Sequence, residues 1–252
     1  MVRKLSILIP VYNEAGTIDE LLRRVLAVRF PIERELVVVD DGSTDGSRQM
    51  LARSVRTLPF KLIEHEMNMG KGAAIQTALK HATGDVVVVQ DADLELDPSD
   101  LPNLLEPIRS GQADVCYGSR FLNGLPVRYR LKATYWANRL LNALSNRING
   151  LRITDFNTGY KMMTTAVLSR IAITQSGFEM ESEITGKLAR LGLKIVERPV
   201  RYTPRSVRAG KKIRFTDVFR YVQAMIRYRF LWAGDVPGAA NAATVKPDWV
   251  SA

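Results

Sequence analysis

The sequence of 252 residues contains one cysteine, two histidines and no long apolar run. A single cysteine excludes an intrachain disulfide, and Cys116, which follows Val115 in an expected strand, is interpreted as a core residue rather than a nucleophile. His65 and His81 have no partner at metal-ligand spacing. A spanning helix needs about 18 apolar residues in a row, and none is expected. The apolar run 5–11 is also too short for a signal peptide.

Three short runs in the N-terminal half are apolar, rich in β-branched residues and closed by polar turn residues. They cover residues 5–11, 35–39 and 86–90. Such runs are typical of buried parallel strands. Helical patterns lie between and after them, at roughly 17–28, 45–55 and 71–82. The alternation predicts an α/β sandwich whose ligands bind beyond the carboxyl ends of the strands, so the polar clusters after the three runs are expected in one crevice.

Small and polar residues mark the expected helix starts. Thr17 and Asp45 are predicted N-caps, and Glu20 would complete a Thr-x-x-Glu capping box. The run Gly70-Lys71-Gly72 lacks the GxxxxGK[ST] spacing of a P-loop. We therefore expect it to open the third helix tightly rather than to bind phosphate.

An acidic run, Asp-Ala-Asp-Leu-Glu at 91–95, directly follows the third apolar run. In extended backbone, alternate positions point to one side, so Asp91, Asp93 and Glu95 would converge. Three carboxylates repel one another unless a hard divalent cation joins them, and Mg²⁺ or Mn²⁺ with a bound diphosphate suits such oxygen ligands. The alternative is a solvated acidic turn, because a DxD pattern alone is short.

Eight motifs in order carry a family resemblance. The first five are PVYNE (10–14), VDDGSTD (39–45), NMGKGAA (68–74), DADLE (91–95) and GSRF (118–121). Together they resemble the family 2 glycosyltransferases, whose GT-A fold is a mostly parallel central sheet flanked by helices. The later motifs are FNTGYK (156–161), GFEMESEITGKLARLG (177–192) and YTPRSVRAGKKI (202–213). They are similar to the dolichyl- or polyprenyl-phosphate hexosyltransferase branch, which includes the dolichyl-phosphate mannose synthases.

The resemblance spans roughly residues 4–230 and implies a donor site. It implies an inverting transfer of a hexose, mannose in preference to glucose, from GDP-mannose or UDP-glucose. A divalent ion on Asp91, Asp93 and Glu95 would neutralise the leaving diphosphate, although members commonly carry Gln at the position of Glu95. Glu14 would bind the ribose and Asp41 the base. The implied donor-binding residues are Pro10, Tyr12, Glu14, Val39, Asp41, Asp91, Ala92, Asp93, Arg120 and Lys211.

The acceptor decides whether a catalytic base is required. A dolichyl or undecaprenyl phosphate is already ionised near pH 7 and needs cations to position it, whereas a hydroxyl acceptor needs a general base. Arg120 and Arg205 suit a phosphate because the arginine fork binds it bidentately. With Asp93, they are the predicted catalytic residues. Transfer to a hydroxyl of another lipid or small molecule is the enzymatic alternative, and a basic peripheral membrane-binding module is the non-enzymatic one.

The net charge of +10 is concentrated near the C-terminus. Residues 201–229 hold nine Lys or Arg against Asp217 alone, and 213–230 shows apolar residues at helical spacing. Such a basic amphipathic helix suits an anionic membrane surface. A second helix, 131–148, has an apolar stripe of Trp136, Leu140, Leu144 and Ile148. Both stripes could instead pack on the protein itself, which we favour for the second. Nucleic-acid binding is not expected, since no zinc-finger, RNP or helix-turn-helix pattern accompanies the charge.

These patterns predict three segments: a GT-A domain at 1–210, a membrane-surface helix at 211–233 and a flexible tail at 234–252. A polyprenyl acceptor stays in the bilayer, yet no spanning helix is expected. We therefore predict a cytoplasmic protein, peripheral at the cytoplasmic face of a membrane and held there directly or by a separate membrane subunit.

Overall fold

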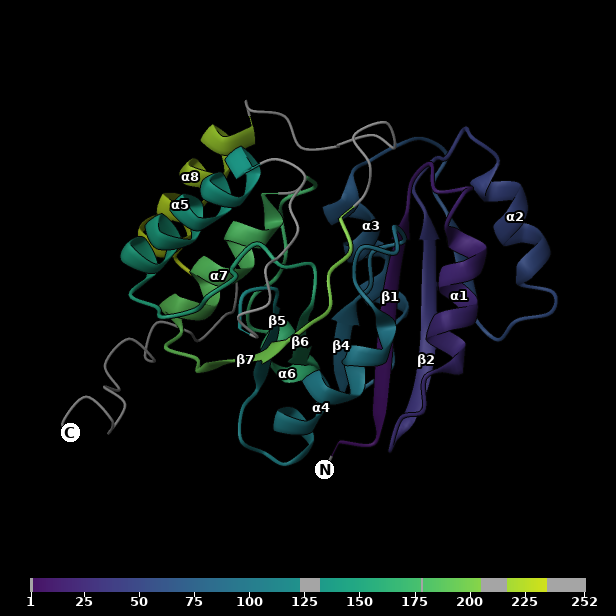
Figure 1. The fold of residues 1–252 in the computed structure, drawn as a ribbon, viewed down its shortest axis with the longest axis horizontal. Helices are drawn as coiled ribbons and strands as arrows, with labels where there is room; N and C mark the ends of the chain where they lie inside the picture. The colour runs from purple at the N-terminus through teal and green to yellow at the C-terminus, as the bar shows by residue number, and fades with distance from the viewer. Residues whose placement is uncertain (1, 123–131, 178, 205–216, 235–252) are drawn as a thin grey trace.

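The computed structural model describes residues 2–122, 132–177, 179–204 and 217–234 (Figure 1). Its seven-stranded sheet has the order β3-β2-β1-β4-β6-β5-β7. The strands are β1 (Lys4–Val11), β2 (Glu33–Asp40), β3 (Lys61–Glu64), β4 (Val86–Val89), β5 (Val115–Ser119), β6 (Lys161–Thr164) and β7 (Ile195–Pro199). β6 pairs antiparallel with β4 and β5, and the other pairings are parallel. The expected mostly parallel α/β sandwich is confirmed.

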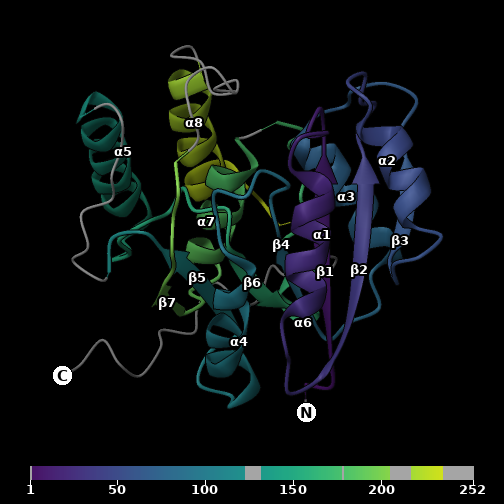
Figure 2. The same ribbon diagram turned by 45° about the vertical axis from the view of Figure 1, so that its right-hand side comes forward.

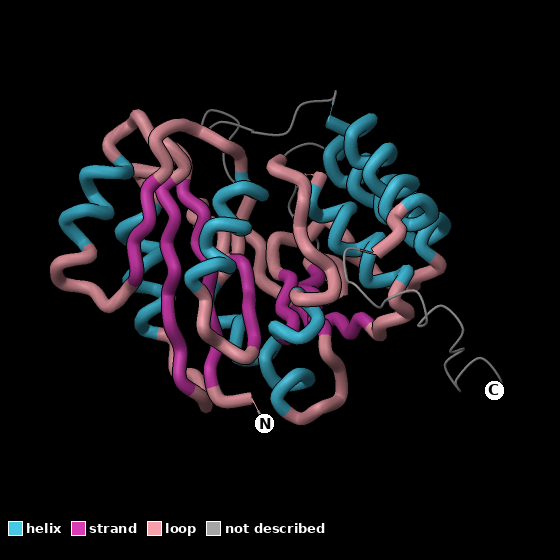
Figure 3. The backbone as a smooth tube through the Cα atoms, turned by 180° about the vertical axis from the view of Figure 1, so that it is seen from behind, coloured by secondary structure: helices cyan, strands magenta, loops and turns pink. Residues whose placement is uncertain are grey.

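The helices cover both faces of this sheet, whose strands lie side by side in Figure 3. They are α1 (Ile18–Ala27), α2 (Ser47–Ser54), α3 (Lys71–His81), α4 (Leu101–Arg109), α5 (Lys132–Asn149), α6 (Thr165–Leu168), α7 (Met180–Arg190) and α8 (Asp217–Ile226). A 3-10 turn, Pro98–Asp100, precedes α4, and a π-helical turn, Arg227–Leu231, follows α8. None of the helices in the described ranges is both long and apolar enough to cross a bilayer.

Alternating side chains of β1 build the core on the two faces of the sheet. Ile7 and Ile9 pack with Leu21 of α1, whereas Leu8 packs with Ile75 of α3 on the other face. All five side chains are at most 1% exposed. Full burial of each contributes roughly 1.5–3 kcal/mol. In β5, Cys116 is also fully buried, and burial raises the pKa of its thiol to about 12, as expected of a core residue.

A further hydrophobic cluster joins α7 and α8 to the sheet. From α8 and the π-helical turn, Tyr221, Met225 and Tyr228 are buried against residues of α7 that include Ile184 and Leu188. The described part of the C-terminal helix thus buries apolar side chains inside the protein, one of the two alternatives that its spacing left open. Residues 205–216 and 235–252 lie outside the described ranges.

Helix α5 forms where its spacing predicts, but the expected packing of its stripe is wrong. Trp136, Leu140 and Leu144 are exposed, and only Ile148 packs against the protein. The inward face is polar instead. Asn142, for example, donates to Ile153 O at 2.8 Å and accepts from Phe156 N at 2.9 Å. The backbone of the following loop needs such partners once it is buried, and this determines which face of α5 points inward.

The helix starts differ in detail from the predicted caps. Thr17 precedes α1, but its side chain makes no capping bond. Its hydroxyl lies 2.8 Å from Ala92 O instead, and Glu20 pairs with Arg24 at 2.7 Å, so the capping box is wrong. At α2, the cap residue is Gly46, while Asp45 still accepts from Ser47 N at 3.0 Å. The third helix does begin at Lys71, as predicted.

Glu35, near the start of β2, is bound by polar groups of two neighbouring segments. Its carboxylate lies 2.6 Å from Ser6 Oγ, 2.9 Å from Thr83 Oγ1 and 3.1 Å from Lys4 Nζ. Burial alone would raise the pKa of Glu35, but these partners lower it to about 2. The ionised form therefore stabilises the fold above the ordinary pKa of about 4.5, and this contribution is lost as the pH falls toward 2.

We expect Glu35→Gln to lower the free energy of unfolding at pH 7 by about 1–2 kcal/mol, less than the full pKa shift implies because the site is partly exposed. The deficit relative to wild type should shrink between pH 4.5 and pH 2.5. Urea unfolding at several pH values measures both. Glu33→Gln is the matched control, since Glu33 is 70% exposed and lies 3.4 Å from the same Lys4. A deficit independent of pH would contradict this account.

Candidate functional site

The polar segments after β1, β2 and β4 meet at one edge of the sheet, as the sequence predicts. β1 pairs in parallel with both β2 and β4, so the carboxyl ends of the three strands lie together. Direct hydrogen bonds join the first two segments. Asn13 N donates to Ser43 Oγ at 3.0 Å, and Glu14 N donates to Ser47 Oγ at 2.8 Å.

Glu14 lies at the centre of this junction and is only 6% exposed. Its Oε2 is 3.0 Å from the hydroxyl of Thr17, and that hydroxyl is also 2.8 Å from Ala92 O. The segment after β1 is thereby connected to the acidic turn after β4. The role of Glu14 at a ribose stays a prediction, and the structure adds that Glu14 is held by Ser47 at the start of α2 and by Thr17 before α1.

The acidic run 91–95 is a turn, and the prediction that its carboxylates converge in extended backbone is wrong. Leu94 adopts the left-handed conformation, with φ of 60°. Asp93 Oδ1 accepts from Glu95 N at 3.1 Å, and Glu95 Oε2 accepts from Tyr202 OH at 3.1 Å. Over the residues that the structure describes, no group of three or more His, Cys, Asp or Glu is placed to hold a metal ion.

The turn nevertheless fits a divalent ion of a particular kind. Mg²⁺ is usually bound by one or two carboxylates together with substrate phosphates and water, rather than by an all-protein cage. Asp93 offers carboxylate oxygens in a half-buried turn, with Asp91 and Glu95 close in the chain. The donor set therefore suits an ion shared with a bound diphosphate, and the three-carboxylate site remains unsupported.

A network of four charges anchors the start of this turn. Lys71 Nζ lies 2.8 Å from Asp91 Oδ1 and 3.5 Å from Glu181 Oε1. The other oxygen of Glu181 pairs with Lys161, whose Nζ also donates to Thr158 O at 2.7 Å. Burial lowers the pKa of Lys71, but the two carboxylates more than offset this and raise it. The pKa of Lys161 is lowered, because its burial outweighs Glu181.

Two glycines allow the close approach on which the network depends. A Cβ at Gly159 would lie 2.5 Å from Asp91 Oδ2, and a Cβ at Gly72 would lie 2.1 Å from Gln175 O. Any other residue would push the acidic turn or α3 away. Lys71 and Glu181 are not among the site residues predicted from the sequence, although the glycines on both sides of Lys71 are a signal of close packing.

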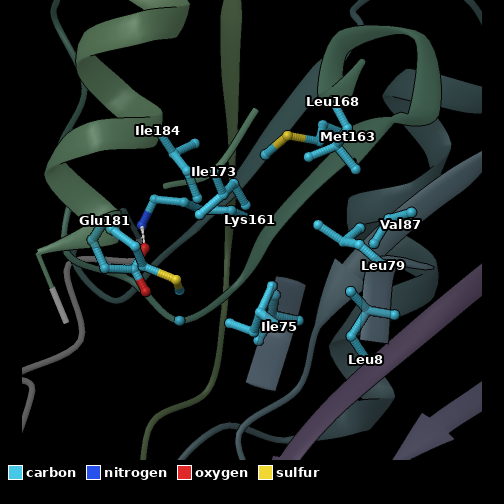
Figure 4. Close-up of a pocket in the computed structure, with 13 residues that line it drawn as sticks. Leu8, Ile75, Leu79, Val87, Lys161, Met163, Leu168, Ile173, Glu181 and Ile184 are labelled. Atoms are coloured by element: carbon cyan, nitrogen blue, oxygen red, sulfur yellow. Dashed lines mark hydrogen bonds and ion pairs between the residues drawn. The ribbon is translucent and has the colours of Figure 1, made fainter. Parts of the chain in front are cut away.

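A small apolar pocket adjoins this network between α3, α7 and the sheet (Figure 4). Ile75, Leu79 and Ile184 line it, and Lys161 and Glu181 face each other at its edge. Apolar surroundings exclude water and strengthen an ion pair, while making either partner costly alone. Loss of either partner would therefore leave Lys161 or Glu181 beside this pocket without its neutralising charge.

Asp41 holds the loop that leads into α3. Its carboxylate accepts from Met69 N at 2.9 Å and Gly70 N at 2.8 Å, and lies 2.7 Å from His65 Nδ1. His65 Nε2 in turn lies 2.9 Å from Thr77 Oγ1. Asp41 is 2% exposed. Its predicted contact with a nucleotide base stays a prediction, whereas its positioning of the loop is observed. His65, interpreted as a lone residue, is its partner.

Arg120 follows β5 and directs its fork at a buried carboxylate. Its Nε and one terminal nitrogen lie 2.7 and 2.8 Å from the two oxygens of Asp155. The guanidinium also lies 5.1 Å from the ring centre of Tyr202, a favourable cation–π distance. The fork is thus occupied by Asp155 in this structure, and its predicted contact with a phosphate stays a prediction. Arg120 is a fixed cation, joined through Tyr202 to Glu95.

The remaining predicted donor residues lie as follows. Val39 and Ala92 are buried, and Pro10 and Tyr12 are half-buried at the end of β1, so their contacts with a donor stay predictions. Arg205 and Lys211 lie outside the described residues, so their roles stay predictions.

Comparison with known proteins places this geometry in context. The profile of the family described as Glycosyl transferase family 2 matches residues 6–172. The chain is 30% identical over 240 residues to a dolichol-phosphate mannosyltransferase of Pyrococcus furiosus, covering 92% of this chain and 65% of that protein. It is 30% identical over 178 residues to a dodecaprenyl-phosphate galacturonate synthase of Rhizobium johnstonii, covering 68% and 50%. It is 34% identical over 159 residues to an undecaprenyl-phosphate 4-deoxy-4-formamido-L-arabinose transferase of Pseudomonas syringae, covering 62% and 45%.

The chain thus spans about half to two thirds of the length of these relatives. Among solved structures, its fold is similar to that of glucosyl-3-phosphoglycerate synthase from Mycobacterium tuberculosis, crystallised with Mn²⁺, UDP and glucosyl-3-phosphoglycerate. The TM-score is 0.66 at 22% identity, with 90% of this chain and 80% of that chain covered. This likeness confirms the GT-A fold expected from the motifs.

The charge network leads to a prediction about stability. We expect Lys71→Met and Asp91→Asn to be coupled by about 1–3 kcal/mol in a double-mutant cycle, because each alone leaves a desolvated partner. Urea unfolding of the two single variants, the double variant and the wild type gives the coupling energy. The exposed pair Glu106 and Arg109, 3.0 Å apart, is the matched control and should give less than about 0.5 kcal/mol. Equal coupling in both cycles would refute the anchoring role.

Proposed function

The chain belongs to glycosyl transferase family 2, and from that premise we propose that it transfers a hexose to a polyprenyl phosphate. The donor is a nucleotide-diphosphate sugar, GDP-mannose or UDP-glucose, with mannose preferred, and the anomeric carbon is inverted. One observation carries the proposal: the acidic turn after β4 lies beside Glu14 and is anchored by Lys71 at the edge where β1, β2 and β4 end. Ligands of open α/β sheets bind at this edge.

The names of the relatives support the acceptor class more strongly than the sugar. One is named for dolichol phosphate with mannose, one for dodecaprenyl phosphate with galacturonate, and one for undecaprenyl phosphate with a substituted arabinose. A polyprenyl phosphate is common to all three, whereas the sugars differ. We therefore propose the acceptor by analogy with these relatives. The identity of the hexose is to be determined by comparing donors directly.

On the donor side, the residues at the strand ends hold the nucleotide and its diphosphate. Glu14 and Asp41 are proposed to contact the ribose and the base, as the family resemblance implies. When bound, Mg²⁺ or Mn²⁺ would neutralise the charge that develops on the leaving diphosphate. Asp93 is proposed to hold the ion, with Glu95 as a further ligand. Lys71 already balances Asp91 at 2.8 Å, so the turn does not present its full negative charge to the diphosphate.

On the acceptor side, positioning replaces proton transfer. A lipid monophosphate is ionised near pH 7, so its oxygen can attack without a general base. Arg120, fixed between Asp155 and Tyr202, supplies positive charge beside the acidic turn. We propose that Arg205 binds the acceptor phosphate and that Lys211 assists at the donor diphosphate. Because the lipid stays in its bilayer, the protein would act at the cytoplasmic membrane face, alone or with a membrane subunit.

Activity should require a divalent ion and Asp93. We expect excess chelator to abolish transfer, added Mn²⁺ or Mg²⁺ to restore it, and Asp93→Ala to lower kcat/KM on the order of 10²–10³-fold. Product formation from GDP-mannose or UDP-glucose with a short polyprenyl phosphate measures this. Glu106→Ala, which changes an exposed carboxylate on α4, is the matched control. Full turnover in excess chelator would contradict the assignment of a metal ion to this site.

Arg205→Ala should impair use of the acceptor. Loss of a charge-assisted phosphate contact should cost about 2–4 kcal/mol of transition-state binding, seen chiefly as a raised KM for the lipid phosphate. Arg201→Ala is the neighbouring control, because Arg201 is exposed and pairs with Asp100 at 2.8 Å. Saturation curves for the lipid phosphate that match wild type in Arg205→Ala would place the acceptor site elsewhere.

A further inference from the structure

Helix α5 exposes large apolar side chains on its outer face. Trp136, Leu140 and Leu144 follow one another at intervals of four residues and are 68%, 71% and 36% exposed. Residues four apart lie on the same side of a helix. The three side chains therefore form one stripe on the outer face. Figure 2 shows α5 at the outer edge of the molecule, beyond α8.

The polar inner face prevents this stripe from turning inward. Asn142, Ser145 and Asn149 are 7%, 0% and 3% exposed. The amide of Asn146 donates to Ile153 O at 2.7 Å and accepts from Ile153 N at 3.2 Å, adding to the bonds of Asn142. Rotation of α5 would bury its apolar side chains, but it would break these hydrogen bonds and leave buried polar atoms without partners. The apolar face is therefore held outward by the fold.

Charge on the same helix indicates what this face meets. The sequence of α5, KATYWANRLLNALSNRIN, contains three basic residues and no acidic ones. Arg139 and Arg147 are exposed, and the chain carries a net charge of +10. An apolar stripe flanked by arginines suits the interface of an anionic bilayer, where rings and aliphatic chains enter the acyl boundary and arginines meet headgroups.

Aromatic contacts connect the stripe to the site. The rings of Trp136 and Tyr135 are 5.5 Å apart, and those of Tyr135 and Phe121 are 6.0 Å apart. Phe121 lies 5.7 Å from the guanidinium of Arg120. A lipid surface against α5 would thus lie next to the cation that we place near the acceptor phosphate.

We propose that α5 docks the protein on an anionic lipid surface, with Trp136, Leu140 and Leu144 entering the bilayer interface. The inference deepens the proposed function by naming the surface that meets the lipid, and rests on it only for the acceptor. It differs from docking by the C-terminal helix, whose Tyr221, Met225 and Tyr228 are buried in the protein.

Vesicle flotation with the full chain tests the proposal without any substrate. Wild type should float with vesicles that contain 30% anionic lipid, and less so in high salt. Leu140→Gln/Leu144→Gln should lower the partition coefficient about tenfold or more. Ile226→Gln/Phe230→Gln, which changes apolar groups exposed near the C-terminal helix, is the matched control and should bind like wild type. Circular dichroism melting should be unchanged in both, since the altered side chains are exposed.

Fluorescence quenching by brominated acyl chains gives a second readout. In a Trp249→Phe background, vesicles of brominated lipid should quench emission strongly, because Trp136 inserts while Trp232 is only 8% exposed. Trp136→Phe in that background should abolish the quenching. Three outcomes would overturn the proposal: no flotation of wild type, equal flotation of the α5 variant, or a dimer in solution that the α5 variant dissociates.

Transfer assays separate this inference from the proposed function. The α5 variant should lose transfer to a long polyprenyl phosphate in vesicles but keep transfer to a short, water-soluble one. Absence of all transfer by wild type, together with lipid binding through α5, would reject the proposed function and leave the docking surface standing.

Discussion

The site depends on a neutralised carboxylate at the end of β4. Asp91 begins the acidic turn, and Lys71 of α3 balances its charge at 2.8 Å. Lys71 also faces Glu181 of α7, and Glu181 pairs with Lys161 of β6. Because a desolvated charge is costly without a partner, the four elements hold one another in register. The N-terminal half of the sheet is thereby joined to the C-terminal half.

Much of the fold was predictable because the first strands can be recognised from their own residues. The runs 5–11, 35–39 and 86–90 are continuous and apolar, as buried parallel strands are. The short strands β6 and β7 include charged residues such as Lys161 and Glu197, so their pattern was weak. Helical spacing located α5 but could not say which face points inward. That direction was decided by the loop backbone that Asn142 binds.

The sequence predicted which residues lie at the site better than it predicted how their side chains are arranged. The order of motifs identified the strand-end residues, but one left-handed residue, Leu94, turned the acidic run away from extended backbone. Such a conformation is not encoded by a DxD pattern. The partners of the site residues are far apart in the chain: Lys71 and Glu181, Arg120 and Asp155, Asp41 and His65. No local pattern relates these positions, so their pairing emerges only from the fold.

The burial of Cys116 has a practical chemical consequence. Only the thiolate attacks alkylating reagents efficiently, and this thiol is fully buried with its pKa raised to about 12. The native protein should therefore be inert toward maleimides while it stays folded. A cysteine introduced at Met67, which is 69% exposed in the loop next to the site, would accept a spin label or dye selectively. Movements of that loop on substrate binding could then be followed spectroscopically without altering Cys116.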